Sequence, residues 1–299
     1  MADRRLQVFH AVARHLSFTR AADALFMTQP AVTFQIRQLE EQYRTRLFER
    51  RHGGISLTPA GEIVLSYAER ILALGDELEA RLAEMTDEMQ GPLLLGASAT
   101  IAECLLPRLL GEFNALYPRV RVTLMVANSE GIEQRVAERS IDLGLIELAP
   151  RLPGLAGRSC CADELVVVCA PDHPLAGQAT VCARELVDYE YIGRETGSGT
   201  RQAVEHYFTG HGIDARELKT LMELGSPEAL KAVVAGGLGF AILSRLAVER
   251  VCQDGVLRAL PLQPPLCREF YLVHPQERFQ SRVVGSFIDF AARQLRDAG

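Results

Sequence analysis

Apolar residues near the start of the chain recur at steps of three and four positions, which is the spacing of a helix with one buried face. Five residues form this face of a first helix: Leu6, Phe9, Val12, Ala13 and Leu16. A second, short helix is predicted from Thr19 to about Leu25, because the hydroxyl of Thr19 can cap its free amide groups. The second helix is rich in alanine, so another helix can approach it closely.

A third helix is predicted from Gln29 to about Tyr43. Thr28 is expected to be its N-cap, and Pro30 falls in the first turn, where a missing amide hydrogen costs nothing. The inward stripe of this helix is Val32, Ile36 and Leu39. Its outer face carries side chains that can hydrogen-bond base edges or phosphates: Gln29, Thr33, Gln35, Arg37 and Gln38. On an isolated helix such a face is more often simply solvated.

A basic hairpin after the third helix favours the DNA-binding interpretation. Two short strands, at residues 47–49 and 55–57, flank Gly53 and Gly54, a pair suited to a tight turn. Basic residues lead into the turn: Arg44, Arg46, Arg50, Arg51 and His52. Such a wing can lie along phosphates or reach a minor groove. Residues 1–58 therefore predict a winged helix-turn-helix that binds double-stranded DNA, with bases read between Thr28 and Arg37.

The charge of the chain is divided in the same way. Residues 1–58 contain nine arginines and five acidic residues, a net charge of +4, whereas the whole chain of 299 residues carries −6. The remainder is therefore near −10. A basic head on an acidic body fits nucleic-acid binding that is confined to the head.

A long amphipathic helix is predicted from residue 59 to about residue 89. Its apolar positions lie three or four residues apart: Val64, Tyr67, Ile71, Leu74, Leu78, Leu82 and Met85. About thirty residues at ~1.5 Å each span roughly 45 Å, more than a small head domain can cover. The stripe therefore needs a partner, either the same helix of a second subunit or the chain's own C-terminal part. Gly91 and Pro92 are expected to end the helix and to form a hinge.

Beyond residue 91, short apolar runs alternate with helical stretches. Strands are predicted at residues 93–97, 120–126 and 143–147, with helices at 101–117 and 129–139. A second set has strands at 165–170, 191–193, 221–224 and 240–243, with helices at 200–209 and 226–235. A last strand at 269–274 and a helix at 281–296 follow. The pattern predicts two α/β lobes with mainly parallel sheets.

Three turns after predicted strands carry hydroxyl groups at the start of a helix, where free amides can bind a small anion. They are Ser98-Ala99-Thr100, Asn128-Ser129 and Thr196-Gly197-Ser198-Gly199-Thr200-Arg201. The third turn combines two glycines, three hydroxyls and the fixed charge of Arg201. Serine and threonine are also ordinary helix caps, so each turn alone is ambiguous. Gly225 and Phe240 are further candidates for the same cleft.

The whole chain resembles the LysR-type transcriptional regulators. The resemblance rests on Ala-Ala at 21–22, Thr-Gln-Pro-Ala-Val-Thr at 28–33, Gln-Leu-Glu at 38–40, Leu-Phe-Glu-Arg at 47–50 and Leu-Thr-Pro-Ala-Gly at 57–61. It departs at the wing tip, where Gly53 stands in place of the usual basic residue. The segment at 194–201 is similar to the branch of the family that controls sulfur assimilation or carbon dioxide fixation, which implies a small anionic effector.

The resemblance also implies an organisation and a set of partners. It implies a DNA-binding domain at 1–58, a dimerisation helix at 59–90 that pairs antiparallel with its copy, and a periplasmic-binding-protein-like effector domain at 91–299. Lobe I comprises 91–162 and 269–299, and lobe II comprises 163–268, with crossings near 148–163 and 264–268. The effector is expected between the lobes. Members of the family often form tetramers, and RNA polymerase is an expected partner.

Composition narrows the remaining alternatives. No apolar run reaches about eighteen residues and the N-terminus lacks a signal-peptide pattern, so a cytoplasmic protein is expected. The seven cysteines form no Cys-x-x-Cys pair, which argues against a disulfide framework and a zinc site, and neither a metal nor a cofactor is predicted. They are interpreted as buried thiols, with a peroxide-sensing cysteine switch as the alternative. An enzyme or a solute-binding protein built on the lobes is the alternative from another class, but no catalytic constellation is present.

Overall fold

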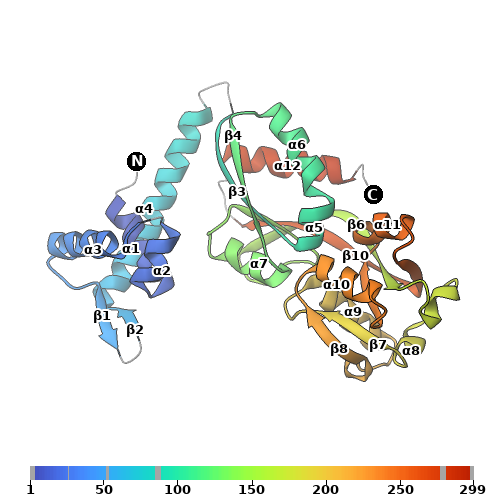
Figure 1. Ribbon diagram of the computed structural model, residues 1–299. Helices are drawn as coiled ribbons and strands as arrows, with labels where there is room; N and C mark the ends of the chain where they lie inside the picture. Colours follow the sequence, from blue (N-terminus) through green and yellow to red (C-terminus); the bar gives the residue numbers. More distant parts are fainter. Residues whose placement is uncertain (1–3, 26, 52–53, 85–88, 277–280, 297–299) are drawn as a thin grey trace. The chain divides into compact units, whose positions relative to one another are not determined.

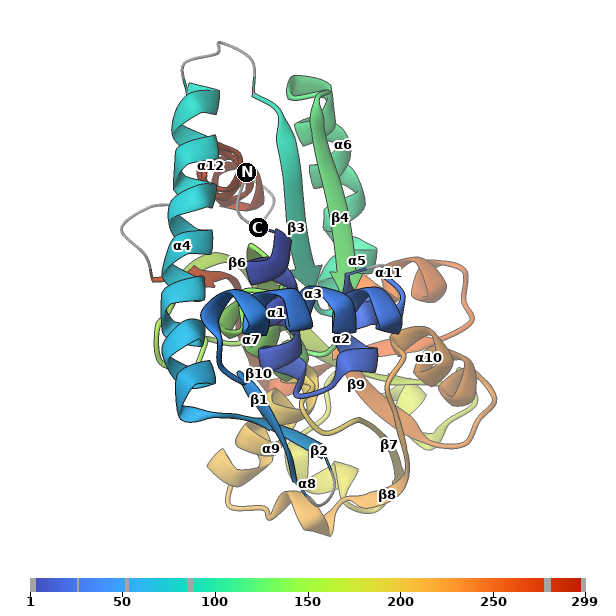
Figure 2. The same ribbon diagram turned by 90° about the vertical axis from the view of Figure 1, so that its left-hand side faces the viewer.

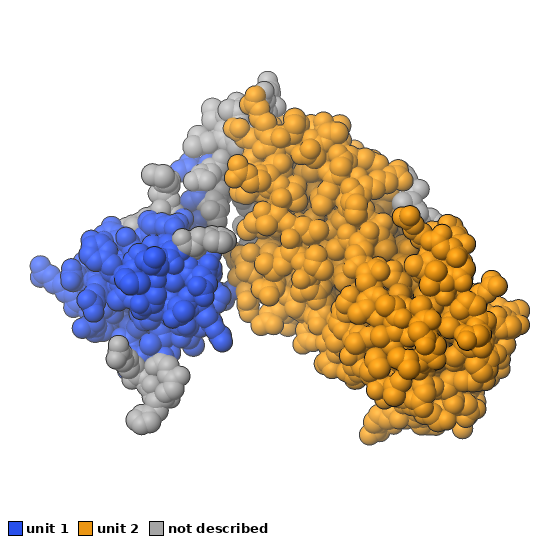
Figure 3. All heavy atoms as spheres, viewed as in Figure 1, with its two compact units in different colours: residues 1–88 blue, residues 89–299 orange. Residues whose placement is uncertain are grey.

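The computed structural model describes residues 4–25, 27–51, 54–84, 89–276 and 281–296. The chain divides into two compact units, Met1–Glu88 and Met89–Gly299 (Figure 3). Each unit has its own apolar core. The first unit is a helical head with a two-stranded hairpin, and the second is built around one large sheet (Figure 1). No described helix is long and apolar enough to cross a membrane.

Three helices form the core of the head: α1 (Arg4–His15), α2 (Phe18–Ala24) and α3 (Gln29–Tyr43). The apolar stripe predicted for α3 is buried, and so are four of the five residues predicted to face inward on the first helix. Leu16 is the exception, because it follows α1 with a φ of 44° and is 49% exposed. The prediction that Thr19 caps α2 is wrong. Ser17 is the cap, since its Oγ accepts the amide hydrogen of Arg20 at 3.3 Å.

The hairpin consists of β1 (Phe48–Arg51) and β2 (Gly54–Leu57), paired antiparallel. Glu40 in α3 positions its start. The largely buried carboxylate of Glu40 accepts the amide hydrogen of Leu47 at 2.8 Å and pairs with Arg46 at 3.0 Å. The first strand therefore begins one residue later than predicted and extends further toward the turn.

One long helix, α4 (Pro59–Glu84), leaves the hairpin. Gly61 stands in its first turn because a Cβ there would lie 2.2 Å from the carbonyl oxygen of Leu47. The prediction extends this helix to about residue 89, but the described helix ends at Glu84, and residues 85–88 lie outside the described part. Gly91 and Pro92 are not a hinge, because both are already paired with strand β4 in the sheet of the second unit.

A single eight-stranded sheet runs through the second unit in the order β4-β3-β5-β10-β6-β9-β7-β8 (Figure 1). Its strands are β3 (Gly91–Ala97), β4 (Val120–Val126), β5 (Leu143–Ile146), β6 (Leu155–Cys169), β7 (Glu190–Arg194), β8 (Lys219–Leu224), β9 (Phe240–Ser244) and β10 (Arg258–Pro275). β3 pairs in parallel with β4 and β5, and β7 pairs in parallel with β8 and β9. The predicted parallel sets are thus confirmed, one in each lobe.

The long strands β6 and β10 connect the lobes. They pair antiparallel with each other, and β5 and β9 pair antiparallel on their outer sides. The expected crossings near 148–163 and 264–268 coincide largely with these strands. The lobes are therefore joined by continuous sheet rather than by separate linkers.

Helices cover both faces of the sheet. They are α5 (Ala99–Cys104), α6 (Leu106–Leu116), α7 (Ser129–Ala137), α8 (Ala183–Leu186), α9 (Gly199–Gly210), α10 (Pro227–Ala235), α11 (Arg245–Gln253) and α12 (Arg282–Arg296), with 3-10 turns at Pro174–Gly177 and Ala215–Glu217. Figure 2 shows one of them, α6, beside β4. The single helix predicted at 101–117 is two helices, because the ring of Pro107 cannot continue α5. α11 is absent from the sequence prediction.

Alternation along β6 explains how the second lobe is covered on both faces. Leu165, Val167 and Cys169 belong to an apolar cluster with α8 and α9, whereas Val166 and Val168 belong to another with α10 and α11. In the first lobe, α6 and α12 pack on one face and α7 on the other. The starts of α5, α7 and α9 are left at the boundary between the lobes.

Candidate functional site

The outer face of α3 and the hairpin enclose a surface hollow of about 490 Å³. Gln29, Thr33 and Arg37 line it from α3, because residues four positions apart share one helix face. Arg46 and Glu49 line its hairpin side. Gln35 is not among the lining residues, since its position falls on another side of α3. Three of the five predicted base-reading or phosphate-binding side chains are thus brought together, and Gln35 and Gln38 are set apart.

Two hydrogen bonds order the first turns of α3. Gln29 Nε2 donates to Thr33 Oγ1, and that hydroxyl donates to the carbonyl of Gln29, both at 3.0 Å. Thr28 occupies the N-cap position with Gln29 and Pro30 in the first turn, and all three are exposed. Phe34 is also exposed, at 57%. The sequence pattern does not single out this ring, which offers an apolar surface suited to a thymine methyl group.

The basic residues of the hairpin lie close to its turn. Arg50 pairs with Ile55 and Arg51 pairs with Gly54 in the strand register. His52, the remaining predicted wing residue, lies outside the described residues. A second hollow, of about 440 Å³, lies along the end of α3 and the segment that follows it. Charged side chains make up most of its lining: Arg37, Glu40, Glu41, Arg44 and Arg46.

An apolar stripe on α4 faces solvent in the single chain. Its side chains are between 45% and 62% exposed: Ile63, Tyr67, Ile71, Leu74 and Leu78. Val64 instead packs against the core of the head. The side chain of Leu82 and the whole of Met85 lie outside the described part of the helix. Contiguous exposed apolar surface of this kind marks an interaction site.

Glu147, which directly follows β5, is the centre of a buried polar cluster between the lobes. Ser98 Oγ donates to its Oε1 at 3.2 Å, and Thr200 Oγ1 donates to its Oε2 at 3.3 Å. Ser129 Oγ accepts the main-chain amide hydrogen of Glu147 at 3.4 Å. All four residues are more than nine-tenths buried. Hydroxyls from the three predicted turns therefore meet around Glu147, two at its carboxylate and one at its main-chain amide.

The environment of Glu147 favours its charged form. Burial raises the pKa of this carboxyl, but Arg268, whose Nη1 lies 2.9 Å from Oε2, and the hydroxyl of Thr100 outweigh that effect. The pKa of Glu147 accordingly lies below its usual 4.5. An internal cation and several hydroxyls take the place that water has around an exposed carboxylate.

Arg268 is held by groups from several strands. Its Nε donates to Asp163 Oδ2 at 2.8 Å, and its Nη1 donates to Thr200 Oγ1 at 2.9 Å. Its guanidinium also lies over the ring of Phe270, 5.3 Å from the ring centre. Ser244 Oγ donates to Asp163 Oδ1 at 2.6 Å. Burial raises the pKa of Asp163 despite the neighbouring arginine.

The sequence pattern does not single out Glu147, Asp163 or Arg268. Each is an ordinary charged residue at the end of, or within, an apolar strand, and their contacts join segments far apart in the chain. The one available signal is the position of Glu147, because acidic residues directly after buried strands lie where ligands bind in α/β sheets.

The turn at 196–197 contacts α7 across the lobe boundary. Asn128 Nδ2 donates to the carbonyl of Thr196 at 3.1 Å, and the amide of Glu130 donates to the carbonyl of Gly197 at 3.2 Å. Gly197 has a φ of +85°, and a Cβ there would lie 2.8 Å from the Glu130 carboxylate. A Cβ on Gly199 would lie 2.6 Å from the Cβ of Glu147. Both glycines of the predicted turn thus allow the lobes to approach closely.

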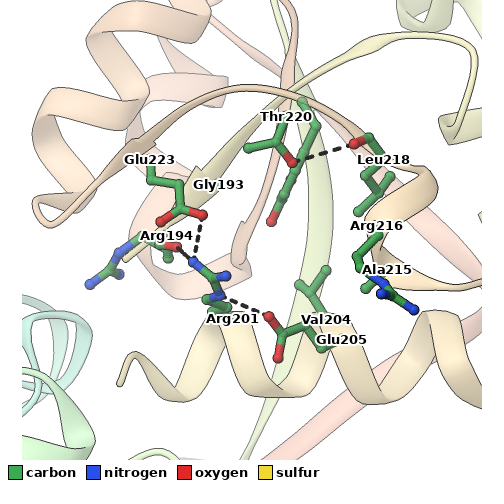
Figure 4. A pocket seen from close by; sticks show the side chains of 11 residues that line it. Gly193, Arg194, Arg201, Val204, Glu205, Ala215, Arg216, Leu218, Thr220 and Glu223 are labelled. Atoms are coloured by element: carbon green, nitrogen blue, oxygen red, sulfur yellow. Dashed lines mark hydrogen bonds and ion pairs between the residues drawn. The ribbon is translucent and has the colours of Figure 1, made fainter. Parts of the chain in front are cut away.

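Arg201 lies apart from the hydroxyl cluster. Its guanidinium pairs with Glu205 at 2.8 Å and with Glu223 at 2.6 Å in a pocket of about 360 Å³ (Figure 4). Its charge is therefore already neutralised within the second lobe. In the same view the side chain of Arg194 extends away from this pocket. Arg194 Nη2 donates to the carbonyl of Gly225 at 3.3 Å. Through this hydrogen bond Gly225 helps to position Arg194.

The remaining predicted effector residues have local structural roles in this structure. Ser198 caps α9 by accepting the amide hydrogen of residue 201 at 3.5 Å. Ala99 is the first residue of α5. Phe240 is fully buried, and its ring packs against Tyr191 with 5.3 Å between the ring centres.

Two protein families match the chain over most of its length. Residues 4–62 match the family described as "Bacterial regulatory helix-turn-helix protein, lysR family", and residues 86–296 match the LysR substrate binding domain. The chain belongs to the LysR family. It is a DNA-binding transcriptional regulator whose second unit is an effector-binding domain.

Curated relatives of this LysR-family regulator include a regulator of a RuBisCO operon and a transcriptional activator. The RuBisCO operon transcriptional regulator of Allochromatium vinosum is 35% identical over 288 residues, which cover 96% of this chain and 94% of the relative. The HTH-type transcriptional activator CmpR of Synechocystis is 35% identical over 289 residues, which cover 96% and 93%. These relatives are transcriptional regulators.

Solved structures show the same architecture. The regulatory domain of Synechocystis CcmR in complex with 2-PG is 33% identical, with a TM-score of 0.64, and the match covers 70% of this chain and 99% of that domain. A full-length OxyR variant from Pseudomonas aeruginosa has a TM-score of 0.72 at 21% identity, covering 98% and 93%. The OxyR likeness shows the fold alone.

The prediction that the cysteines are buried holds only for Cys160 and Cys169, because four others are partly exposed and Cys267 is exposed. Burial raises the pKa of the Cys104, Cys161 and Cys169 thiols to about 11. The thiolate is the reactive form, so a raised pKa opposes the cysteine-switch alternative. Within the described residues, no group of three or more His, Cys, Asp or Glu side chains is arranged to hold a metal ion.

Proposed function

We propose that α3 and the hairpin bind operator DNA, with bases read in the major groove and phosphates held at the sides. The residues of this interface are Thr28, Gln29, Pro30, Thr33, Gln35, Arg37, Arg50, Arg51 and His52. The hollow shared by Gln29, Thr33 and Arg37 supports this assignment, because amide, hydroxyl and guanidinium groups on one helix face can engage base edges and the backbone together.

The effector is a small acid bound between the two lobes of 91–299. Its site is formed by Ser98, Ala99, Thr100, Ser129, Thr196, Gly197, Ser198, Gly199, Thr200, Arg201, Gly225 and Phe240. The observation that carries this proposal is the convergence of hydroxyls from three separate turns on one buried point between the lobes. The relatives that regulate RuBisCO operons, and CcmR with bound 2-phosphoglycolate, support a phosphorylated acid.

In this proposal each part of the chain has one role in regulation. Residues 1–58 bind DNA in the cytoplasm, 59–90 join two subunits through the stripe of α4, and 91–299 respond to the effector, with lobe I at 91–162 and 269–299 and lobe II at 163–268. Pairs of dimers then occupy neighbouring half-sites and contact RNA polymerase. An effector changes DNA binding only through its different affinities for two lobe arrangements, with typical couplings of about 1–3 kcal/mol.

A footprinting experiment on the full-length protein tests this function. Duplexes selected from a random pool would be footprinted with and without 2-phosphoglycolate, which is expected to change the length of the protected region. Thr100→Ala should reduce that response and leave basal binding unchanged, because Thr100 hydrogen-bonds within the buried cluster. Thr209→Ala is the matched control, since its hydroxyl bonds only within α9. Failure to select any preferred sequence, or equal loss of both activities in Thr100→Ala, would count against the proposal.

A further inference from the structure

The hydroxyl cluster is already occupied by an anion of the chain. Ser98 and Thr200 donate to the two oxygens of Glu147, and Arg268 Nη1 pairs with the same carboxylate. A ligand phosphate or carboxylate at this place would meet a second negative charge in a buried setting, where like charges repel strongly. The acid group of an effector therefore needs other donors.

Two buried donors are unused. Among the described residues, the buried side-chain nitrogen and oxygen atoms that lack a hydrogen-bond partner are Arg194 Nη1 and Arg268 Nη2. Both residues are more than nine-tenths buried. A buried guanidinium nitrogen without an acceptor is costly, and native proteins keep few of them. Such atoms indicate a place where an acceptor is required.

Both arginines interact electrostatically with carboxylates of the first lobe. Arg194 is the last residue of β7 in the second lobe, yet its charge lowers the pKa of Glu147 and of Glu103 in the first lobe. Figure 4 shows its side chain directed away from the pocket around Arg201. Arg268 contacts Glu147 directly. Both arginines therefore act on the carboxylate of Glu147, Arg268 by direct contact and Arg194 through its charge.

The orientation of each guanidinium is set by its other bonds. Arg194 Nε and Nη2 form a fork on Glu195, at 2.9 Å and 3.2 Å, which leaves Nη1 as the remaining donor. Arg268 Nε and Nη1 are taken by Asp163 and Glu147, which leaves Nη2. A donor that is held in place before binding loses little entropy when an acceptor arrives.

We propose that the acid group of the effector binds to Arg194 and Arg268 through these two nitrogen atoms, and that Glu147 is a built-in carboxylate that keeps this group away from the hydroxyls. The ligand class is a small phosphate or carboxylate. This inference rests on the proposed function, namely that an anionic effector enters between the lobes. It assigns the charged contact to residues outside the predicted turns, and it makes Glu147 a determinant of affinity.

Calorimetric titration of the full-length protein tests the assignment, with 2-phosphoglycolate, inorganic phosphate and inorganic sulfate as probes. Arg194→Gln should weaken binding at least tenfold, because a charge-assisted contact is lost. Glu147→Gln should tighten binding at least threefold, because it removes the repelling charge and keeps the shape of the side chain. Arg184→Gln is the matched control, since it removes an exposed arginine of the same lobe that pairs with Glu217, and it should change affinity less than twofold.

Several outcomes would overturn the inference. Binding that survives Arg194→Gln but is lost in Ser98→Ala overturns it and leaves the proposed effector site standing. Weaker binding in Glu147→Gln shows that this carboxylate accepts from the ligand rather than excluding it. If none of the three anions binds the unsubstituted protein, the anionic effector itself is wrong. Melting temperatures identify any variant that fails to fold, and should Arg194→Gln do so, the direction of change in Glu147→Gln decides.

Discussion

Arg268 Nη1 lies 2.9 Å from Glu147 Oε2 between the lobes, and both side chains are at most 3% exposed. The same guanidinium binds Asp163 at 2.8 Å, so one buried cation serves two buried carboxylates. Such a group tolerates loss of a member poorly, because the charge that is left behind has no water to solvate it.

Glu147→Ala should therefore destabilise the second unit by about 3 kcal/mol, the usual cost of breaking a buried ion pair. Urea unfolding followed by circular dichroism measures the change. Glu164→Ala provides a control from the next pair along β6, because Glu164 and Arg245 are both partly exposed and such pairs contribute about 1 kcal/mol or less. Equal destabilisation by the two substitutions would mean that the buried ion pair contributes no more to the free energy of unfolding than the partly exposed pair.

The advantage of the unsubstituted protein over Glu147→Gln should depend on pH. The pKa of Glu147 is lowered in the folded state, so its charge stabilises the fold above its ordinary pKa of 4.5, and this contribution is lost as the pH falls through the lower folded value. The difference in unfolding free energy should be constant from pH 7 to about pH 5 and then shrink. A difference that stays the same down to pH 3 contradicts the assigned ionisation.

Substitutions on α3 should separate specificity from affinity. Gln29→Ala and Thr33→Ala are expected to weaken binding to the preferred sequence more than to scrambled DNA, by about 1–3 kcal/mol for a lost base contact. Arg37→Ala should weaken binding to all sequences and reduce the salt slope by about one. Gel-shift titrations at several salt concentrations measure both quantities. Arg108→Ala, an exposed arginine of the second unit, should change neither.

The stripe of α4 should control assembly. Leu74 is 62% exposed in the single chain, so Leu74→Glu places a charge in the apolar stripe. It should weaken the pairing of α4 with the same helix of a second subunit without disturbing the head. Sedimentation equilibrium is expected to show at least a tenfold weaker dimer. Glu62→Gln, a polar exchange in the first turn of the same helix, should assemble normally. An unchanged dimer in Leu74→Glu would move the subunit contact elsewhere.

The thiols whose pKa is raised should resist peroxide. With a pKa of about 11, Cys104, Cys161 and Cys169 carry a thiolate fraction of roughly one in ten thousand at pH 7. Alkylation followed by mass spectrometry should modify the exposed Cys267 first. DNA affinity should not change with stoichiometric peroxide. A peroxide effect that disappears when one of these three cysteines is replaced by serine would restore the redox alternative.

The head could be predicted closely from its sequence, because its signals are local. The stripe of Val32, Ile36 and Leu39 and the cap at Thr28 depend only on spacing within one helix. The errors there are also local: Ser17 and Thr19 are both good caps, and only the backbone decides between them. Gly91 and Pro92 suggest a hinge between two elements, yet both residues pair with β4 as the first residues of β3.

The effector site could be predicted only in part. The hydroxyls of Ser98, Ser129 and Thr200 can be predicted from the sequence, because serine and threonine after a strand are a recognisable pattern. The role of Arg268 cannot, since its partner Asp163 is 105 residues away and nothing local distinguishes either residue. Arg201 stays a prediction of the turn pattern, and local spacing also explains its present contact, because Glu205 lies one helical turn later and binds its guanidinium.

The paired strands β6 and β10 limit how the two lobes of the regulator can move against each other. Lobes that are joined by flexible linkers can rotate with little distortion of the backbone. Two strands that are hydrogen-bonded along their length must instead bend or twist when the lobes rotate. The ladder between them is irregular between Pro261 and Leu266 and between Phe270 and Tyr271, and bending is easiest where a ladder is interrupted. Any rotation of one lobe against the other is therefore expected to be small and concentrated at these two interruptions of the ladder.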